Sequence, residues 1–382
     1  MHSANNGGVI RFGRLLVLLS IWIPITLISG REVKIAAAAP PCCSVFLPLI
    51  KSSAAISQIY WGALVGTAGQ VDCPSNANMQ PGGPFDAFET RVNKGMAILH
   101  WGQPWNMNGA FQKFPTGDFN NARNHGSLPL LDWSSEALGG GPNQPAYALS
   151  KITSGLYDSF IRQWALDAKA WGHPFFLRFN WEMNGNWHYP WSVQLNGNQP
   201  SDFVRAWQHV HDIFANAGAS NVTWVWCPNI SDPGTTPMAA VYPGDSYVDW
   251  TCLDGYNKEN AWVDFNTVFT GRGINWLLNS YNEILAVAPT KPLMIGETAS
   301  IEAGDGGAKK AAWITDALLT QLPTNFPKVK AVVWFNFLYG VQDFRAESTQ
   351  PSLNAFAAGI GSNYYAANDF ANYDISPIRP LP

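Results

Sequence analysis

The chain has 382 residues, of which 13% are aromatic and 13% are charged, and 18 of them are Trp. This length fits either two ordinary domains or one large barrel, and the apolar content is sufficient for a large core. The net charge of -4 and the lack of basic clusters argue against nucleic acid and anionic membrane as partners. Some of the tryptophan is expected to form a binding surface.

The N-terminal segment has the features of a targeting sequence. Basic residues precede an apolar stretch, residues 15–29, that is short for a membrane span and interrupted by proline. Small residues at 36–38 offer a cleavage site. We therefore expect residues 1–39 to be a signal peptide, residues 40–56 to be a linker, and the protein to be secreted. An uncleaved N-terminal anchor is the alternative.

Cysteine and histidine spacing gives no metal-binding motif. Cys227 and Cys252 lie near two successive predicted strands and are candidates for a disulfide, which the sequence alone does not decide. No zinc-type cysteine spacing and no nucleotide-binding glycine loop occurs. His100, His125 and His188 match no ligand motif, so we interpret them as structural or loop residues, with substrate contact or a metal site as the alternative. We expect neither a metal nor a cofactor.

Eight apolar runs have the length and the turn boundaries of buried strands. They are residues 58–65, 95–101, 128–133, 174–180, 222–228, 249–256, 291–297 and 329–336. Between several of them, apolar residues recur every three or four positions, which is typical of amphipathic helices. Eight buried strands alternating with helices predict an α/β fold, a single (β/α)8 barrel over residues 57–365, followed by a C-terminal tail, residues 366–382.

The predicted helices have identifiable ends. One helix has a face of five apolar residues between Leu156 and Trp171, and a second follows Ser201, which we expect to be its N-cap. A third covers residues 311–322 and is expected to stop at Pro323, and residues 348–360 form the last. The link between the fifth and sixth strands is short and rich in Pro and Gly, so we expect no regular helix there.

The run from His173 to Trp191 is the most informative stretch of the chain. It begins as a buried strand and ends in Glu182, among aromatic residues, and a carboxylate in such surroundings is costly unless it is paired or reacts. Side-chain alternation places Arg178, Asn180 and Glu182 on one side of the strand. Glu182 is therefore either an active-site carboxylate or half of a structural Arg–Glu pair.

A second glutamate ends the seventh strand as Glu182 ends the fourth. Glu297 closes the sequence Met-Ile-Gly-Glu, and the carboxyl ends of barrel strands form the active sites of such folds. Glycoside hydrolysis uses a pair of carboxyl groups, one to protonate the leaving oxygen and one to attack or to activate water. The two positions together favour a catalytic pair, although each glutamate separately could be a salt-bridge partner.

Tryptophans near the predicted strand ends are candidate platforms for sugar rings. They are Trp101, Trp105, Trp133, Trp187 and Trp191. For each of them, packing at the barrel rim is the alternative. Asn221 and Asn229 fit the N-glycosylation pattern, which also occurs often by chance.

Several motifs resemble glycoside hydrolase family 26. They are Arg178 followed by Glu182-Met-Asn-Gly, then Tyr242-Pro-Gly-Asp, then Ile295-Gly-Glu. The similarity runs from about Tyr60 to Tyr339, which is most of the mature chain. The best-known members of this family are endo-β-1,4-mannanases, and others cleave mixed-linkage β-glucan or β-1,3-xylan.

The resemblance implies roles for individual residues. Glu182 would be the general acid/base and Glu297 the nucleophile of a retaining double displacement. Tyr256 would donate a hydrogen bond to the nucleophile, and Trp334 would form the floor under the sugar at the cleavage point. The acid role requires a raised pKa for Glu182, which the charge of Glu297 and apolar surroundings would supply.

One position departs from the family pattern. Mannanases of this family usually have His immediately before the acid/base, whereas this chain has Trp181. We expect a secreted, monomeric, retaining endo-β-glycanase that hydrolyses β-1,4-mannosidic linkages. The alternatives are a lichenase-like endo-β-1,3-1,4-glucanase and a non-catalytic polysaccharide-binding barrel. The expected substrate-binding residues are Arg178, Trp181, Trp187, Tyr256, Trp334, Trp101 and Trp133.

Overall fold

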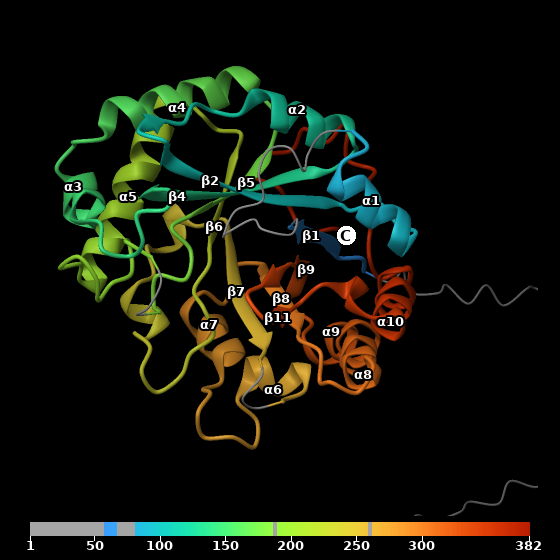
Figure 1. The fold of residues 1–382 in the computed structure, drawn as a ribbon. Helices are drawn as coiled ribbons and strands as arrows, with labels where there is room; N and C mark the ends of the chain where they lie inside the picture. Colours follow the sequence, from blue (N-terminus) through green and yellow to red (C-terminus); the bar gives the residue numbers. More distant parts are fainter. Residues whose placement is uncertain (1–56, 67–80, 186–188, 259–261) are drawn as a thin grey trace, which may run out of the picture. The chain divides into compact units, whose positions relative to one another are not determined.

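The computed structural model describes residues 57–66, 81–185, 189–258 and 262–382. Eight parallel strands close into a barrel, because β1 pairs with both β9 and β2 and the remaining strands pair with their neighbours in order (Figure 1). The predicted (β/α)8 barrel is confirmed. The strands are β1 Tyr60–Val65, β2 Ile98–Met107, β4 Leu128–Ala137, β5 Phe175–Phe179, β6 Val222–Trp226, β7 Trp250–Asn257, β8 Leu293–Ser300 and β9 Val329–Asn336.

Helices surround the barrel in the described part of the chain (Figure 1). The longer ones bury one apolar stripe each, as α4 does with Ile161, Trp164, Ala165 and Ala168, spaced three or four residues apart. They are α1 Pro84–Val92, α2 Thr116–Asn124, α3 Leu149–Thr153, α4 Asp158–Trp171, α5 Pro200–Ala217, α6 Phe265–Thr270, α7 Ser280–Val287, α8 Ala308–Asp316, α9 Leu322–Asn325 and α10 Gln350–Ile360.

Three helix boundaries differ from the prediction. Leu156 precedes α4 and is 63% exposed, so it does not belong to the buried face. The N-cap of α5 is Gln199, not Ser201, since Gln199 and Asp202 form a reciprocal capping box. Pro323 does not stop the third predicted helix but lies in the first turn of α9, where a missing N–H is tolerated.

The link between β6 and β7 contains two short 3-10 turns, Met238–Ala240 and Asp245–Tyr247. All of its residues are described, and none of them forms an α-helix. The prediction of a degenerate helix at this point is therefore confirmed.

The inside of the barrel changes from aromatic to charged along the strands. At the level where the strands begin, the ring of Phe176 lies 5.5 Å from Trp250 and 6.4 Å from Tyr60. Arg178 follows Phe176 by two residues on β5, so alternation directs both side chains inward. The aromatic layer thus supports a charged layer, which lies under the mouth formed by the carboxyl ends of the strands.

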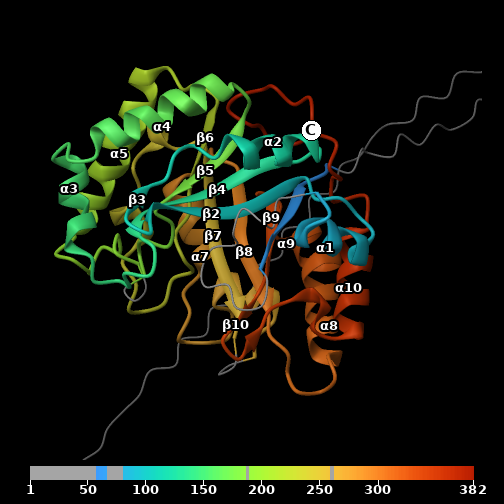
Figure 2. The same cartoon turned by 45° about the horizontal axis from the view of Figure 1, so that its top comes forward.

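Residues 366–382 cross the opposite end of the barrel (Figure 2). The indole of Trp250 donates to Ile378 O at 2.8 Å, and the hydroxyl of Tyr60 donates to Arg379 O at 2.8 Å. Ile378 itself is buried. The segment therefore covers the aromatic layer on the side away from the mouth.

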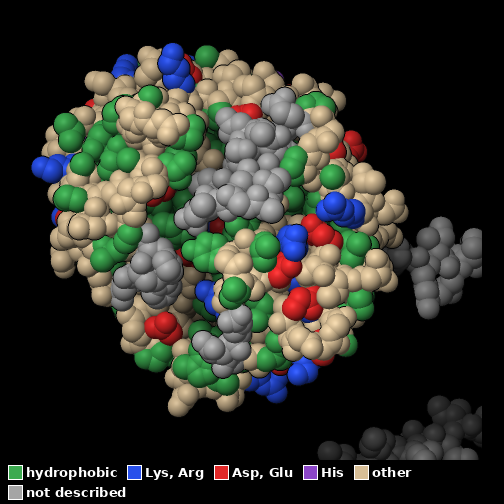
Figure 3. All heavy atoms as spheres, in the orientation of Figure 1, with side chains coloured by type: hydrophobic (Ala, Val, Ile, Leu, Met, Phe, Trp, Pro, Cys, Tyr) green, Lys and Arg blue, Asp and Glu red, His purple; other side chains and the backbone are tan. Residues whose placement is uncertain are grey.

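The described surface carries no large cluster of basic side chains on the face shown in Figure 3. On the face seen in Figure 3, hydrophobic side chains gather in several patches and the described Lys and Arg side chains are scattered. Within the described ranges, each helix is too short or too polar to cross a membrane. The predicted signal peptide and linker, Trp187 and His188 lie outside the described residues.

Candidate active site

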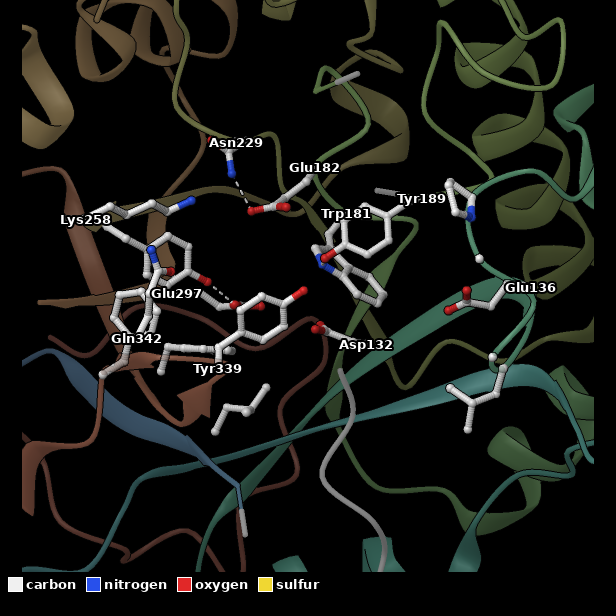
Figure 4. A pocket seen from close by; sticks show the side chains of 18 residues that line it. Asp132, Glu136, Trp181, Glu182, Tyr189, Asn229, Lys258, Glu297, Tyr339 and Gln342 are labelled. Carbon is white, nitrogen blue, oxygen red and sulfur yellow. Dashed lines mark hydrogen bonds between the residues drawn. The ribbon is translucent and has the colours of Figure 1, made fainter. Parts of the chain in front are cut away.

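A pocket of about 450 Å³ opens at the carboxyl ends of the barrel strands. Both predicted catalytic glutamates, Glu182 and Glu297, line it and point into the same space (Figure 4). The other lining residues come from the barrel strands and from the loops that follow them. They are Leu64, Asp132, Glu136, Leu138, Gly139, Gly141, Pro142, Trp181, Tyr189, Asn229, Tyr256, Lys258, Phe335, Tyr339, Gln342 and Phe344.

Glu182 reaches the pocket through an unusual backbone. Strand β5 ends at Phe179, and the φ angles of Asn180 and Glu182 are 49° and 51°, in the left-handed region. This region is accessible to Asn but costs a residue such as Glu about 1–2 kcal/mol. The Glu182 N–H donates to Cys227 O at 2.7 Å, which fixes the turn. Strand alternation beyond Phe179 was thus a wrong basis for placing Glu182, although Glu182 does face the pocket.

Arg178 lies beneath the pocket and does not line it. Its fully buried guanidinium contacts Asp132 through Nε at 3.1 Å, Asp254 through Nη2 at 2.7 Å and Glu297 through Nη1 at 3.1 Å. Burial opposes the charge, but the three carboxylates outweigh it and raise the pKa of Arg178. Its predicted role as a substrate contact is therefore corrected to that of a buried counterion, because no face of it is open to a ligand.

Glu297 lies on β8 and is bound from two sides. Arg178 donates to Oε1, and the hydroxyl of Tyr256 donates to Oε2. The preceding residue must be Gly296, since a Cβ there would lie 2.3 Å from the sulfur of Cys252. The contact predicted between Tyr256 and Glu297 is present, so each carboxylate oxygen of Glu297 accepts a hydrogen bond.

The surroundings of Glu182 raise the pKa of its carboxyl group. Burial, followed by the negative charge of Glu297, raises the pKa of Glu182 to about 7. The positive charge of Lys258 and a hydrogen bond from the Asn229 side-chain amide act in the opposite direction. A carboxyl group with this pKa can donate a proton near neutral pH and accept it back.

Asp254 is a further buried acid of the cluster. Burial raises its pKa well above the ordinary value, the charge of Arg178 lowers it, and the charge of Glu297 raises it further. Burial, followed by the charges of Glu297 and Glu182, also raises the pKa of Tyr256. Tyr256 therefore keeps its proton and remains a donor to Glu297.

Trp181 forms the wall beside the acid/base candidate (Figure 4). Its indole N–H lies 3.2 Å from the hydroxyl of Tyr189, and its ring centroid lies 5.6 Å from the guanidinium carbon of Arg178. Trp191 is fully buried and donates to Trp181 O at 2.7 Å. Among the tryptophans that were predicted to bind substrate and that the structure describes, Trp181 is the one that lines the pocket.

The other described tryptophans predicted to bind sugar point away from the pocket. Trp101 and Trp133 have no exposed surface and pack against Phe119 and Trp164, in the layer between strands and helices. Their predicted role as sugar platforms is therefore wrong. Trp334 likewise is 2% exposed and packs on the helix layer, so it does not form the sugar floor.

Several residues of the pocket had no predicted role. Phe335, next to Trp334 on β9, lines the pocket in its place, because alternation turns it inward. Asn229, noted only for its glycosylation pattern, binds Glu182, and Lys258 lies beside the same carboxylate (Figure 4). Asn229 directly follows a predicted strand and Lys258 follows another after Asn257, which is the one sequence feature that could have identified them.

Potential metal ligands gather at three places in the described residues. In the buried group His100, Asp132 and Glu297, Arg178 already contacts both carboxylates. The cysteines of a second group, Cys227 and Cys252, form a disulfide, as the sequence had suggested. The carboxylates of the first group and the sulfurs of the second are thus already engaged by other groups.

The third potential metal site surrounds His125. Its Nε2 lies 2.7 Å from Glu89 and its Nδ1 lies 2.9 Å from the hydroxyl of Ser127. The hydrogen bond with Glu89 raises the pKa of His125. This agrees with the interpretation of His125 as a structural residue, since both ring nitrogens are engaged.

A (β/α)8 barrel with one glutamate after the fourth strand and one on the seventh, both in the pocket at the strand ends, defines the class of barrel glycoside hydrolases. Residues 148–280 match the family model described as glycosyl hydrolase family 26. The chain is similar to this family over these residues, in agreement with the resemblance that its motifs had indicated.

Known proteins resemble the chain in sequence and in fold. Endoglucanase H of Acetivibrio thermocellus is 34% identical over 248 residues, which cover 63% of this chain and 25% of that protein. The chain thus matches about a quarter of its curated relative. The Bacillus subtilis mannanase BCman has 16% identity and a TM-score of 0.57 over 82% of this chain and 88% of its own. A β-mannanase from Bacteroides ovatus has 15% identity to this chain and a TM-score of 0.54. The match covers 85% of this chain and 94% of the mannanase chain. These two structures share the fold.

Proposed function

We propose that the protein is a retaining endo-β-glycanase that cleaves a β-linked polysaccharide of hexose units. The observation that supports this most strongly is the unequal environment of the two pocket glutamates. Glu182 has its pKa raised to about 7, whereas Glu297 accepts hydrogen bonds from Arg178 and Tyr256. Such a difference divides two like groups into a proton donor and a nucleophile.

The proposed reaction has two steps. In the first, Glu182 gives its proton to the glycosidic oxygen while a carboxylate oxygen of Glu297 bonds to the anomeric carbon and the leaving sugar departs with a new hydroxyl. In the second, Glu182 takes a proton from water, the water oxygen bonds to the anomeric carbon and the bond to Glu297 breaks. The anomeric configuration is retained because it is inverted twice.

Mannan was the first substrate predicted from the motifs, and two observations favour β-glucan over it. The curated relative at 34% identity is named an endoglucanase. In addition, Trp181 presents an aromatic wall whose N–H is directed to Tyr189. Such a wall suits the CH-rich face of an all-equatorial sugar and offers no partner to an axial hydroxyl. We therefore rank β-glucan first and β-1,4-mannan second.

Product analysis tests this proposal. The wild-type protein is incubated with glucomannan, galactomannan, barley-type β-glucan, xylans and carboxymethyl-cellulose, and the anomer released first is identified by NMR. We expect internal cleavage of β-glucan with retained configuration.

A second experiment tests the roles of the two glutamates with azide as an external nucleophile. E182A should give the β-glycosyl azide and E297A the α-glycosyl azide. Inverted products would contradict the retaining mechanism, and binding without cleavage would support the binding-barrel alternative.

We also propose that the protein is exported. The predicted signal peptide is one basis for this, and the Cys227–Cys252 disulfide is the other, since structural disulfides persist in oxidising compartments. Expression of the full chain followed by N-terminal sequencing of the protein recovered outside the cells tests the proposal. A mature N-terminus near residue 40 is expected, and retention of the intact chain in the cell would contradict it.

A further inference from the structure

One wall of the pocket is formed by the chain that follows β9. Residues 338–346, which we call the pocket-wall segment, contain β10 Leu338–Tyr339 and β11 Gln342–Asp343. Tyr339, Gln342 and Phe344 of this segment line the pocket. The ring of Phe344 also lies 5.4 Å from that of Tyr256, which binds Glu297. The position of the segment therefore affects both the shape of the pocket and the packing around the nucleophile candidate.

Side chains from two other elements fix the backbone of this segment from behind. Lys310 on α8 donates to Asp343 O at 2.9 Å and to Arg345 O at 2.8 Å. The carbonyl between them, Phe344 O, accepts from the indole of Trp334 at 3.1 Å. Three consecutive carbonyls of a loop thus bind side-chain donors of the barrel. Loop carbonyls are commonly satisfied by water, so this arrangement gives the segment a defined position.

Each hydrogen of the Lys310 ammonium group has an acceptor nearby. Its side chain is 0% exposed, and its third hydrogen is accounted for by Ser348 Oγ at 2.8 Å. Three donors therefore meet three acceptors, and the carboxylate of Glu302 lies 3.6 Å away. Burial lowers the pKa of Lys310 to about 8, despite the nearby charges of Glu302 and Asp343, so all three hydrogens are present at neutral pH.

We propose that Lys310 is a positioning residue for the substrate pocket, which fixes the pocket-wall segment against α8 and thereby sets the affinity for the sugar bound at Phe344. The part concerning sugar affinity rests on the function proposed above. Replacement by methionine removes all three donors and leaves the carbonyls of Asp343 and Arg345 without them. Lys309, the exposed neighbour on the same helix, provides the matched control.

The test uses K310M, K309M and W334F in the full chain. W334F removes the donor to Phe344 O and keeps an aromatic ring in the helix layer, so it tests the same anchoring if K310M folds poorly. Hydrogen exchange is followed at the amides of Phe344 and Ala346, which donate to Phe337 O at 3.0 Å and to Asn336 Oδ1 at 2.7 Å. KM and kcat are measured on the polysaccharide that the wild-type protein cleaves best.

We expect K310M to exchange these amides about tenfold faster and to raise KM about tenfold, with kcat reduced less than about threefold. W334F should show the same pattern more weakly, and K309M should equal the wild type. Unchanged local exchange in K310M, or exchange increased equally throughout the barrel, would overturn the proposal. If the wild type cleaved no glycan, the proposed function would fail, whereas faster exchange confined to the pocket-wall segment would still support the positioning role.

Discussion

Nη1 of Arg178, beneath the pocket, lies 3.1 Å from Oε1 of Glu297, which lines it. The same guanidinium contacts Asp132 and Asp254, so a single buried cation compensates three carboxylates. Phe176, two residues earlier on β5, belongs to the aromatic layer below. The strand therefore sets the height of Arg178 in the barrel, and Arg178 in turn sets the position of Glu297.

Replacing Arg178 should affect both stability and catalysis. R178M leaves the buried carboxylates without their counterion, which typically costs about 3–5 kcal/mol, and lowers kcat/KM by more than about a hundredfold. R178K retains the charge but not the three-way geometry, and should recover stability more than activity. Urea unfolding and steady-state kinetics on the same samples check this. The exposed R162M on α4 is the control, and a fully active R178M would contradict the assigned role.

The pH dependence of activity should be determined by Glu182. Its pKa of about 7 predicts that kcat/KM falls as pH rises through that value, because the acid form is lost. Lys258 favours the ionised form, so K258M should raise the pKa and move this alkaline limb upward, by about half a unit to one unit. The measurement is the pH profile of kcat/KM for the wild type, K258M and the exposed control K151M on α3. A limb that does not move, or moves downward, would argue against this electrostatic role.

The same group should make folding stability depend on pH. The pKa of Glu182 is raised in the folded state from 4.5 to about 7, so the folded protein binds more protons within this window. Stability therefore falls as pH rises from about 4.5 to 7, and this contribution is absent in E182Q. Urea unfolding at pH 5 and pH 8 should show E182Q gaining stability relative to the wild type at the higher pH. An equal difference at both pH values would contradict the raised pKa.

The barrel could be predicted from the sequence because its strands are continuous apolar runs bounded by turn residues. The two glutamates could be predicted because Glu297 ends such a run and Glu182 follows one closely. The tryptophans were placed wrongly because proximity to a strand end does not determine which face a side chain occupies. His100 and Asp132 point inward, so alternation turns Trp101 and Trp133 outward.

Other parts of the site depend on contacts that local sequence patterns do not contain. Asn229 donates a hydrogen bond to Glu182, 47 residues away in the sequence, and Lys310 donates one to Arg345 O, 35 residues away. The left-handed backbone at Glu182 likewise depends on the Cys227 carbonyl of the next strand. Such relationships arise only after the barrel has closed, so a single sequence does not show them.

The Cys227–Cys252 disulfide should contribute to stability. It joins neighbouring strands, and its sequence separation of 25 residues corresponds to about 3 kcal/mol of loop-closure entropy. The double variant C227A/C252A should lose about this amount in urea unfolding, and reducing agent should destabilise the wild type but not the variant. Because Asp254 Oδ1 lies 3.2 Å from the Cys227 sulfur, some loss of kcat is also expected. A loss below about 1 kcal/mol would show that the barrel alone holds these strands in place.

Trp181 should determine the choice between glucan and mannan. W181H removes the aromatic wall and the contact with Arg178, and it introduces a ring nitrogen that can bind an axial hydroxyl. We expect kcat/KM on β-glucan to fall about tenfold or more, and the mannan-to-glucan ratio to rise by at least a similar factor. Parallel kinetics on barley-type β-glucan and glucomannan check this, with the exposed W276F as the control. An unchanged ratio would move the specificity to the far walls of the pocket, where Glu136 lies on one side and Tyr339 and Gln342 on the other (Figure 4).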